Sequence, residues 1–153
     1  MKTFISTIKI IFLFLYTCIL SVIAGSALIL QNGDDKYLFF TRGWARTILK
    51  TFNIKVKLIG LEKIKNDKGN IYVANHASMF DIWALQANMP GQLRFVGKAE
   101  VVKIPIFGWI WQYSGNIPIN RKSPKKFIKS LDKASNTILR GKCIILYPEG
   151  TRS

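Results

Sequence analysis

The pattern of hydrophobic and polar positions in this 153-residue chain begins with a long apolar run. No charged residue occurs in Ile10–Gln31, whose length is close to the ~20 residues that cross a bilayer as a helix. We therefore predict a membrane anchor over residues 1–31. A helix that lies in the membrane interface is one alternative. Cleavage as a signal peptide is another, because Ala24-Gly25-Ser26-Ala27 is typical of a cleavage site.

An amphipathic pattern follows in residues 32–52, which we assign to a helix at the membrane interface. Tyr37–Phe52 repeats at helical spacing, with Arg42, Arg46 and Lys50 on one face. The residues expected to make apolar contacts are Leu38, Phe39, Trp44, Ala45, Ile48, Leu49 and Phe52. Basic and aromatic residues together suit an anionic membrane surface, but a domain helix with a solvated basic face has the same periodicity.

Residues 53–153 alternate short apolar runs with helical patterns, which predicts an α/β domain with a sheet flanked by helices. The expected strands are Ile54–Gly60, Ile71–Val73, Arg94–Gly97, Ile117–Ile119 and Cys143–Tyr147. Pro118 indicates that its strand lies at an edge or pairs irregularly. The strand at Cys143–Tyr147 is apolar throughout, so we expect it inside the sheet, between covering elements.

Capping residues predict where two of the helices begin. Ser78 is expected to cap a helix after the Ile71–Val73 strand. Ser123-Pro124 supplies the N-cap and first residue of a later helix, which Gly141 ends. An apolar stripe on that later helix comprises Phe127, Ile128, Leu131, Ala134, Ile138 and Leu139. Its other side carries Lys125, Lys126, Lys129 and Lys133. We expect these lysines to form a solvated face, with contact to an acidic carrier protein as the alternative.

The charge of the chain indicates an anionic partner. Lys and Arg number 23 against 8 Asp and Glu, for a formal net charge of +15. A membrane surface, a phosphorylated substrate, an acidic carrier protein or a nucleic acid would each fit. Cys18 and Cys143 give no disulfide framework, and we expect both to be small buried hydrophobic residues. One histidine and two distant cysteines do not supply the ligands of a zinc site.

The candidate chemistry centres on His76, the only histidine, with Asp81 five positions later. His76 is expected in a turn between the end of a strand and the start of a helix, where α/β proteins commonly bind ligands. An imidazole with a pKa near ~6.5 can take and return a proton, and a carboxylate can orient it. No nucleophilic Ser or Cys is evident beside it, which favours activation of a hydroxyl on the substrate. Alternatively, Ser78-x-x-Asp81 is a capping box in which Asp81 only binds backbone N–H groups.

Three stretches resemble, in order, the sequence blocks of the glycerolipid acyltransferases. Asn75–Asp81 is similar to the first block, Asn-His-x-Ser-x-x-Asp. Gly115–Arg121 resembles the second, Gly-x-Ile-Phe-Ile-Asp-Arg, although Pro118 and Asn120 stand where the family has an aromatic residue and an acid. Tyr147–Ser153 resembles the third, Phe-Pro-Glu-Gly-Thr-Arg-Ser. The matching type is the bacterial 1-acyl-sn-glycerol-3-phosphate acyltransferase, whose sequence continues into a fourth block, so we expect this chain to be truncated at its C-terminus.

The resemblance implies that lysophosphatidic acid is acylated to phosphatidic acid by acyl-CoA or an acidic acyl-carrier protein. His76 would be the general base and Asp81 its orienting carboxylate. The residues implied in substrate binding are Arg121, Glu149, Gly150, Thr151 and Arg152, with Lys98 as a further candidate for the phosphate. The apolar stretch Ala99–Tyr113, by default core, would be a wall for the acyl chain. No metal or other cofactor is implied.

The resemblance also implies membrane lipids as partners, no nucleic acid, and a place at the inner, cytoplasmic membrane with the catalytic domain on the cytoplasmic side. One alternative is an acyltransferase for another lysolipid, such as an amino-acid lipid. A different class of protein, a non-enzymatic membrane protein that holds anionic lipid or nucleic acid, explains the charge and the anchor but not the three ordered blocks. An inactive fragment of a longer enzyme is a further alternative.

Overall fold

The computed structural model describes residues 2–31, 34–65, 69–120 and 122–152. Its α-helices are α1 Lys2–Gln31, α2 Asp34–Thr51, α3 Phe80–Asn88, α4 Phe107–Tyr113 and α5 Pro124–Leu139. Short 3₁₀ helices lie at Leu61–Lys63 and Ala99–Lys103. The strands are β1 Ile71–Val73, β2 Leu93–Lys98, β3 Ile117–Ile119 and β4 Cys143–Leu146. This alternation of strands and helices confirms the predicted α/β class.

Within the described residues the strands form a four-stranded parallel sheet in the order β1-β4-β2-β3. β4 is central, because Ile144 pairs with Ile71 on one side and with Arg94 on the other. Its buried position confirms the expectation from its wholly apolar sequence. β3 lies at an edge, as Pro118 indicated, since a proline cannot donate to a further strand.

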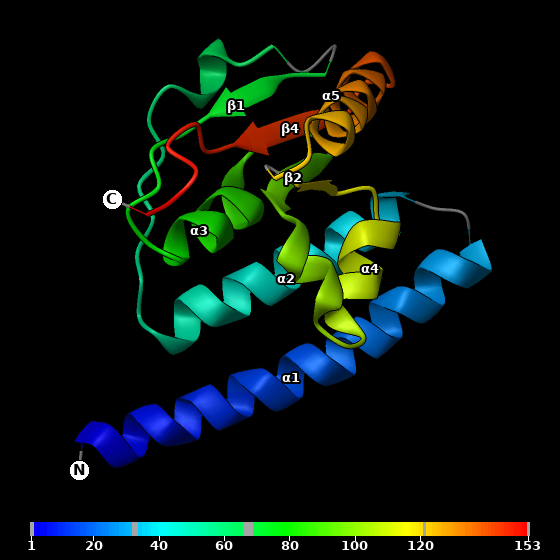
Figure 1. The fold of residues 1–153 in the computed structure, drawn as a ribbon. Helices are drawn as coiled ribbons and strands as arrows, with labels where there is room; N and C mark the ends of the chain where they lie inside the picture. Colours follow the sequence, from blue (N-terminus) through cyan, green and yellow to red (C-terminus); the bar gives the residue numbers. More distant parts are fainter. Residues whose placement is uncertain (1, 32–33, 66–68, 121, 153) are drawn as a thin grey trace.

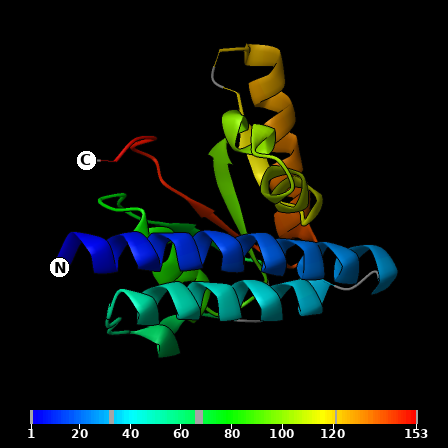
Figure 2. The same ribbon diagram turned by 90° about the horizontal axis from the view of Figure 1, so that it is seen from below.

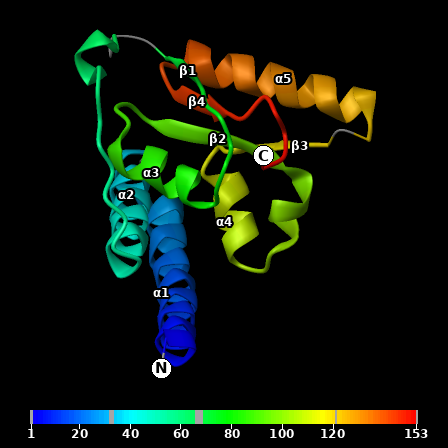
Figure 3. The ribbon, with the colours of Figure 1, turned by 90° about the vertical axis from the view of Figure 1, so that its left-hand side faces the viewer.

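Helices cover both faces of this sheet (Figures 1 and 3). On one face, Leu85 of α3 and Met89 just after it pack against a buried cluster formed by Leu93, Cys143 and Ile145. α2 lies outside α3 on the same side, and α5 lies on the opposite face (Figure 3). Parallel strands need this double cover because neither face of such a sheet is suited to water.

α5 begins and ends where the sequence predicts. The hydroxyl of Ser123 accepts a hydrogen bond from the amide of Lys126 at 3.4 Å, and Pro124 is the first helical residue. Gly141 follows the last turn with a φ of +77°, a conformation that glycine adopts without strain. The apolar stripe is less covered than expected, since Leu139 is 80% exposed.

α2 is packed onto α3 and is therefore part of the folded domain. Ala45 and Leu49 are buried against α3. The guanidinium of Arg42 donates hydrogen bonds to the carbonyl oxygens of Met89 and Gly91, at 2.7 and 3.0 Å. Arg42 consequently does not join a solvated face, which corrects that part of the prediction.

The remaining basic residues of α2, Arg46 and Lys50, are exposed as expected. Phe39, which was expected to make apolar contacts, is 75% exposed and is therefore not covered by the domain. Its ring contacts that of Phe40 edge-on, with centroids 5.8 Å apart. α3 covers the side of α2 that carries Ala45, and Phe39 lies on another side. The helical periodicity of the sequence does not show which side is covered.

α1 is a long apolar helix that runs beside α2 (Figure 2). Phe4–Ala27 is long and apolar enough to cross a membrane by length and composition. The indole of Trp44 donates a hydrogen bond to the Thr17 hydroxyl at 2.9 Å, which joins the two helices. Near the carboxyl end of α1, a Cβ added to Gly25 would come within 2.9 Å of Ile110 in α4. α1 is thus held along the domain, and many of its outward apolar side chains are exposed.

Two further predictions are corrected by the packing. Ile54–Gly60 forms no strand, and Ile59 is 82% exposed. An alternating pattern favours extended backbone, but a strand also needs a neighbour to pair with. Lys133 does not lie on a solvated face, because its ammonium donates a 2.8 Å hydrogen bond to the carbonyl of Asn116.

Candidate active site

His76 lies in the turn between β1 and α3, as the sequence predicts. Val73 pairs with Leu146 at the carboxyl ends of β1 and β4, and the amide of Ala74 continues the ladder with a 3.2 Å bond to Leu146. The side chain of His76 is only 14% exposed. This position at the carboxyl edge of a parallel sheet is where α/β folds usually place a ligand site.

Asp81 binds both the imidazole and the backbone of the turn. One carboxylate oxygen, Oδ2, lies 3.2 Å from His76 Nδ1. The same oxygen accepts hydrogen bonds from the amides of Ala77 and Ser78, each at 2.8 Å. Asp81 therefore makes the backbone bonds of a cap and also contacts the imidazole, so it does not bind backbone N–H groups only. The backbone bonds fix the carboxylate, and the fixed carboxylate orients the imidazole.

The predicted cap at Ser78 is displaced by one residue. α3 begins at Phe80, so Met79 occupies the N-cap position and makes no side-chain cap. The Ser78 hydroxyl still accepts a hydrogen bond from the amide of Phe80 at 3.2 Å. Most of the capping at this turn comes from Asp81, whose carboxylate extends back from the first turn of the helix to the amides of Ala77 and Ser78.

Several effects set the protonation of Asp81. Burial raises its pKa, but hydrogen bonds from the Ser78 amide, the His76 ring and the Ala77 amide together outweigh burial and hold the pKa below its usual value. The carboxylate is therefore ionised at neutral pH. An anion facing Nδ1 favours the imidazole tautomer that carries its proton on Nδ1, which makes Nε2 the basic nitrogen.

Tyr147 is the residue of this site that sequence reasoning missed. Its ring stacks on the imidazole of His76, with centroids 4.2 Å apart and planes inclined by 22°. Its buried hydroxyl has no hydrogen-bond partner among the described residues. Burial, and then the negative charge of Asp81, raise the pKa of Tyr147, which keeps its hydroxyl protonated. The available signal was its place directly after β4, the strand that pairs with β1.

A cavity of about 1710 Å³ adjoins His76. The predicted substrate-binding residues that line it are Lys98, Gly150, Thr151 and Arg152. Lys98 ends β2, and the other three follow β4, so parallel strands bring them to the same edge of the sheet. Glu149 is exposed and is not among the residues lining this cavity, and Arg121 lies outside the described residues.

The rest of the cavity wall is largely apolar. Part of it comes from the Ala99–Tyr113 stretch, through Val101, Ile104, Pro105, Ile106, Phe107, Ile110 and Trp111. α1 and α5 contribute further apolar residues, among them Leu20, Ala24, Leu131 and Ile138. The site thus combines a histidine–carboxylate pair, two cations and a long apolar surface. No group of three His, Cys, Asp or Glu side chains suited to a metal ion occurs within the described part of the chain.

Comparison with known proteins agrees with this arrangement. A family model described as Acyltransferase matches residues 55–153. The chloroplastic 1-acyl-sn-glycerol-3-phosphate acyltransferase of Arabidopsis thaliana is 31% identical over 116 residues, which cover 75% of this chain and 32% of the plant protein. The lyso-ornithine lipid O-acyltransferase of Brucella abortus is 28% identical over 144 residues, covering 88% of this chain and 52% of that protein. The chain therefore spans about a third of the plant relative and half of the bacterial one.

The fold also has a solved counterpart. The crystal structure of the 1-acyl-sn-glycerophosphate acyltransferase PlsC from Thermotoga maritima superposes with a TM-score of 0.64 at 22% sequence identity. The match covers 91% of this chain and 61% of the Thermotoga chain. Because the family model matches most of its residues, the chain belongs to the acyltransferase family.

Proposed function

We propose that this protein transfers an acyl group from acyl-CoA or acyl-carrier protein to the free hydroxyl of lysophosphatidic acid, giving phosphatidic acid. The observation that carries the proposal is the hydrogen bond between His76 and Asp81 beside a large, mostly apolar cavity. A general base needs an orienting partner and a place for substrate next to it, and both are present here.

In the proposed mechanism, Asp81 holds the proton on Nδ1 of His76, and Nε2 removes the proton of the acceptor hydroxyl. The hydroxyl oxygen attacks the thioester carbonyl and forms the new C–O bond. The tetrahedral intermediate then expels the thiolate by breaking the C–S bond. The imidazolium returns its proton to the sulfur, so the thiol leaves and His76 regains its starting form. Asp81 stabilises the imidazolium between these steps.

The lining of the cavity supports two binding regions, one for the acyl chain and one for the phosphate of the acceptor. The apolar residues of α1, α4 and α5 suit an acyl chain, which gains about 0.8 kcal/mol for each buried methylene. Lys98 and Arg152 suit the phosphate of the acceptor, with Gly150 allowing close approach of backbone. We also assign Arg121 and Glu149 to substrate binding, because they stand in the second and third blocks that resemble those of the family. No cofactor takes part in these steps.

We further propose that the protein sits on the inner, cytoplasmic membrane with its catalytic domain on the cytoplasmic side. The packing of α1 along α2 supports the interfacial alternative for this helix over an independent span, because α2 carries charged residues and is packed on the domain. An apolar helix at the surface would bring the cavity, which α1 helps to line, next to lipid substrates.

A second candidate acceptor is a lyso amino-acid lipid. The relative from Brucella abortus, named as a lyso-ornithine lipid O-acyltransferase, aligns with 88% of this chain. The two acceptors differ at the head group, since one is a phosphate monoester and the other is a zwitterion that carries a carboxylate and an ammonium but no phosphate. Lys98 and Arg152 favour the phosphate, because two cations attract a net negative charge more strongly than a zwitterion of zero net charge.

The test is acyl transfer by purified protein in detergent, with radiolabelled acyl-CoA or acyl-carrier protein and each acceptor in turn. The proposal expects labelled phosphatidic acid and little product from lyso-ornithine lipid. The reverse preference would select the second candidate. If the protein binds both lipids with or without thioester but forms no product, the result would support a non-enzymatic membrane protein instead.

A further inference from the structure

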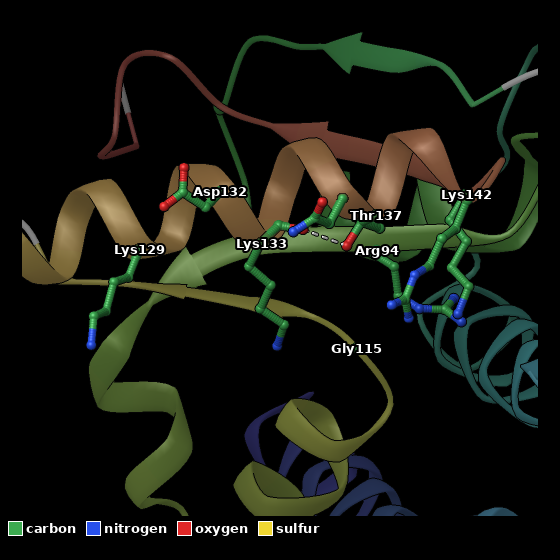
Figure 4. Close-up of a pocket in the computed structure, with 9 residues that line it drawn as sticks. Arg94, Gly115, Lys129, Asp132, Lys133, Thr137 and Lys142 are labelled. Atoms are coloured by element: carbon green, nitrogen blue, oxygen red, sulfur yellow. Dashed lines mark hydrogen bonds between the residues drawn. The ribbon is translucent and has the colours of Figure 1, made fainter.

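A second cavity lies at the opposite end of the strands from His76. Its volume is about 450 Å³. It is formed by one side of α5 from Lys129 to Thr137, together with Arg94 near the start of β2, Gly115 before β3, and Lys142 just before β4 (Figure 4). It shares no lining residue with the cavity beside His76. It is therefore a separate cavity, most of which lies toward the amino edge of the sheet.

The lining of this second cavity is strongly basic. The cations are Arg94, Lys129, Lys133, Arg140 and Lys142, and the one carboxylate in the lining is Asp132. Figure 4 shows Lys129 and Lys133 descending from the same side of α5, with Arg94 and Lys142 gathered farther along. A concave surface of one charge sign focuses the electrostatic field and attracts counter-ions of the opposite sign.

Buried contacts hold two of these cations in place. Arg94 is fully buried, and its Nη1 donates a 2.8 Å hydrogen bond to the carbonyl of Leu93. Beside it, Gly115 has a φ of +95°, and a Cβ there would lie 3.1 Å from the Arg94 Nε. A larger residue at this position would therefore be strained and would crowd the guanidinium.

Lys133 is positioned from the other side of the cavity. Its ammonium donates a 2.8 Å hydrogen bond to the carbonyl of Asn116, a residue that is only 2% exposed. Asn116 is itself fixed, since its Oδ1 accepts a 2.7 Å bond from the amide of Phe95. Burial lowers the pKa of Lys133, so an anion nearby would stabilise its charged form. Bonds to carbonyl groups thus orient both Arg94 and Lys133.

We propose that this second cavity binds a phosphate-bearing anion. The exposed guanidinium of Arg140 offers paired N–H donors that match phosphate oxygens, and the ammonium groups of Lys129, Lys133 and Lys142 add charge. Arg94 is fully buried and contributes charge rather than a direct contact. The anion has one of two sources, a soluble phosphate ester or the head group of an anionic phospholipid. The inference does not depend on the proposed acyl transfer, because none of these residues lines the cavity beside His76.

The test compares the anion binding of a cavity variant with that of a control variant of equal charge. Both are made in the full chain and purified in neutral detergent. The cavity variant carries Lys133→Gln, Arg140→Gln and Lys142→Gln. The control carries three substitutions of exposed lysines outside the cavity: Lys122→Gln, Lys125→Gln and Lys126→Gln. Arg94 is kept, because replacing a fully buried residue endangers the fold. Thermal unfolding checks both proteins. If the triple variant does not fold, Arg140→Gln alone is compared with Lys126→Gln alone.

The soluble arm measures binding of inorganic phosphate and pyrophosphate by calorimetry. The lipid arm measures flotation with phosphatidylcholine vesicles that do or do not contain phosphatidylglycerol. With the probe that matches the source of the anion, we expect the cavity variant to bind at least about tenfold to a hundredfold more weakly, which is the effect of losing one charge-assisted contact. The control is expected to lose much less.

Equal losses in the cavity variant and the control would overturn the proposal, because the effect would then be one of net charge. Failure of the unmodified chain to bind either phosphate probe would also overturn it. Binding of an acidic carrier protein, with no binding of phosphate or of phosphatidylglycerol vesicles, would replace the phosphate site by a protein-docking surface.

Discussion

The imidazole of His76 stacks on the ring of Tyr147, with centroids 4.2 Å apart. Asp81 holds the edge of the same imidazole through Nδ1. A ring fixed by its face and by one edge has little freedom to rotate, so Nε2 keeps a constant direction. Such pre-organisation lowers the cost of reaching the reactive geometry.

Substitutions of Tyr147 separate the ring from its hydroxyl. Tyr147→Phe retains the stack and removes a buried hydroxyl without a partner among the described residues. We expect kcat to stay within about threefold and the free energy of unfolding to be unchanged or higher by up to about 1 kcal/mol. Tyr147→Leu removes the stack, and kcat should fall about tenfold to a hundredfold through misplacement of His76. Equal kcat values for the Leu variant and the wild type would show that the stack does not position the base.

The pH dependence of stability tests the contacts of Asp81. Because its folded-state pKa is lower than the unfolded value of about 3.9, its stabilising contribution is complete above that value and is lost as pH falls through the folded pKa. Asp81→Asn should therefore be less stable than the wild type at neutral pH, and the difference should shrink in acid. Urea unfolding of both proteins between about pH 7 and pH 3 measures this. A difference that does not change with pH would contradict the lowered pKa.

Local patterns predicted the elements around the site better than the contacts between them. The strand before His76, the helix after it and the central position of β4 all follow from apolar runs and turn residues that lie close in sequence. The hydrogen bond between His76 and Asp81 joins residues five apart, so spacing alone suggested it.

The features that the sequence did not predict depend on distant partners. The stack of Tyr147 on His76 requires β4 to pair with β1, which no local pattern specifies. The burial of Lys133 depends on Asn116, a residue 17 positions away. The alternating pattern of Ile54–Gly60 forms no strand, because alternation does not create a neighbouring strand.

Arg152 tests the assignment of the acceptor phosphate. Arg152→Ala should raise the apparent KM for lysophosphatidic acid about tenfold to a hundredfold, the effect of losing one charge-assisted contact. The KM for the acyl donor should change less, and Arg152→Lys should restore only part of the loss because a lysine lacks the paired donors. Lys126→Ala, an exposed cation outside both cavities, is the control. A raised donor KM with an unchanged acceptor KM would place Arg152 against the donor instead.

Removal of residues 1–31 tests the membrane attachment. Much of the protein should leave the membrane, since the outward apolar side chains of α1 are lost. The exposed Arg46 and Lys50 of α2 should retain a weaker, salt-sensitive attachment of about 1 kcal/mol per cation near an anionic surface. Sedimentation with vesicles at low and high salt measures both parts. Undiminished binding of the truncated protein in high salt would show that α1 is not the principal attachment.

The central claim is that His76 is the general base of an acyl transfer, and the most direct measurement is the rate of acyl transfer by a folded His76→Ala variant. With thioester and lysophosphatidic acid both saturating, we expect kcat to fall by about 10²–10⁴-fold, while thermal unfolding and vesicle binding remain those of the wild type. The sequence contains no second histidine to take over the role. A His76→Ala protein that is folded, bound to membranes and still acylates at close to the wild-type rate would contradict the account.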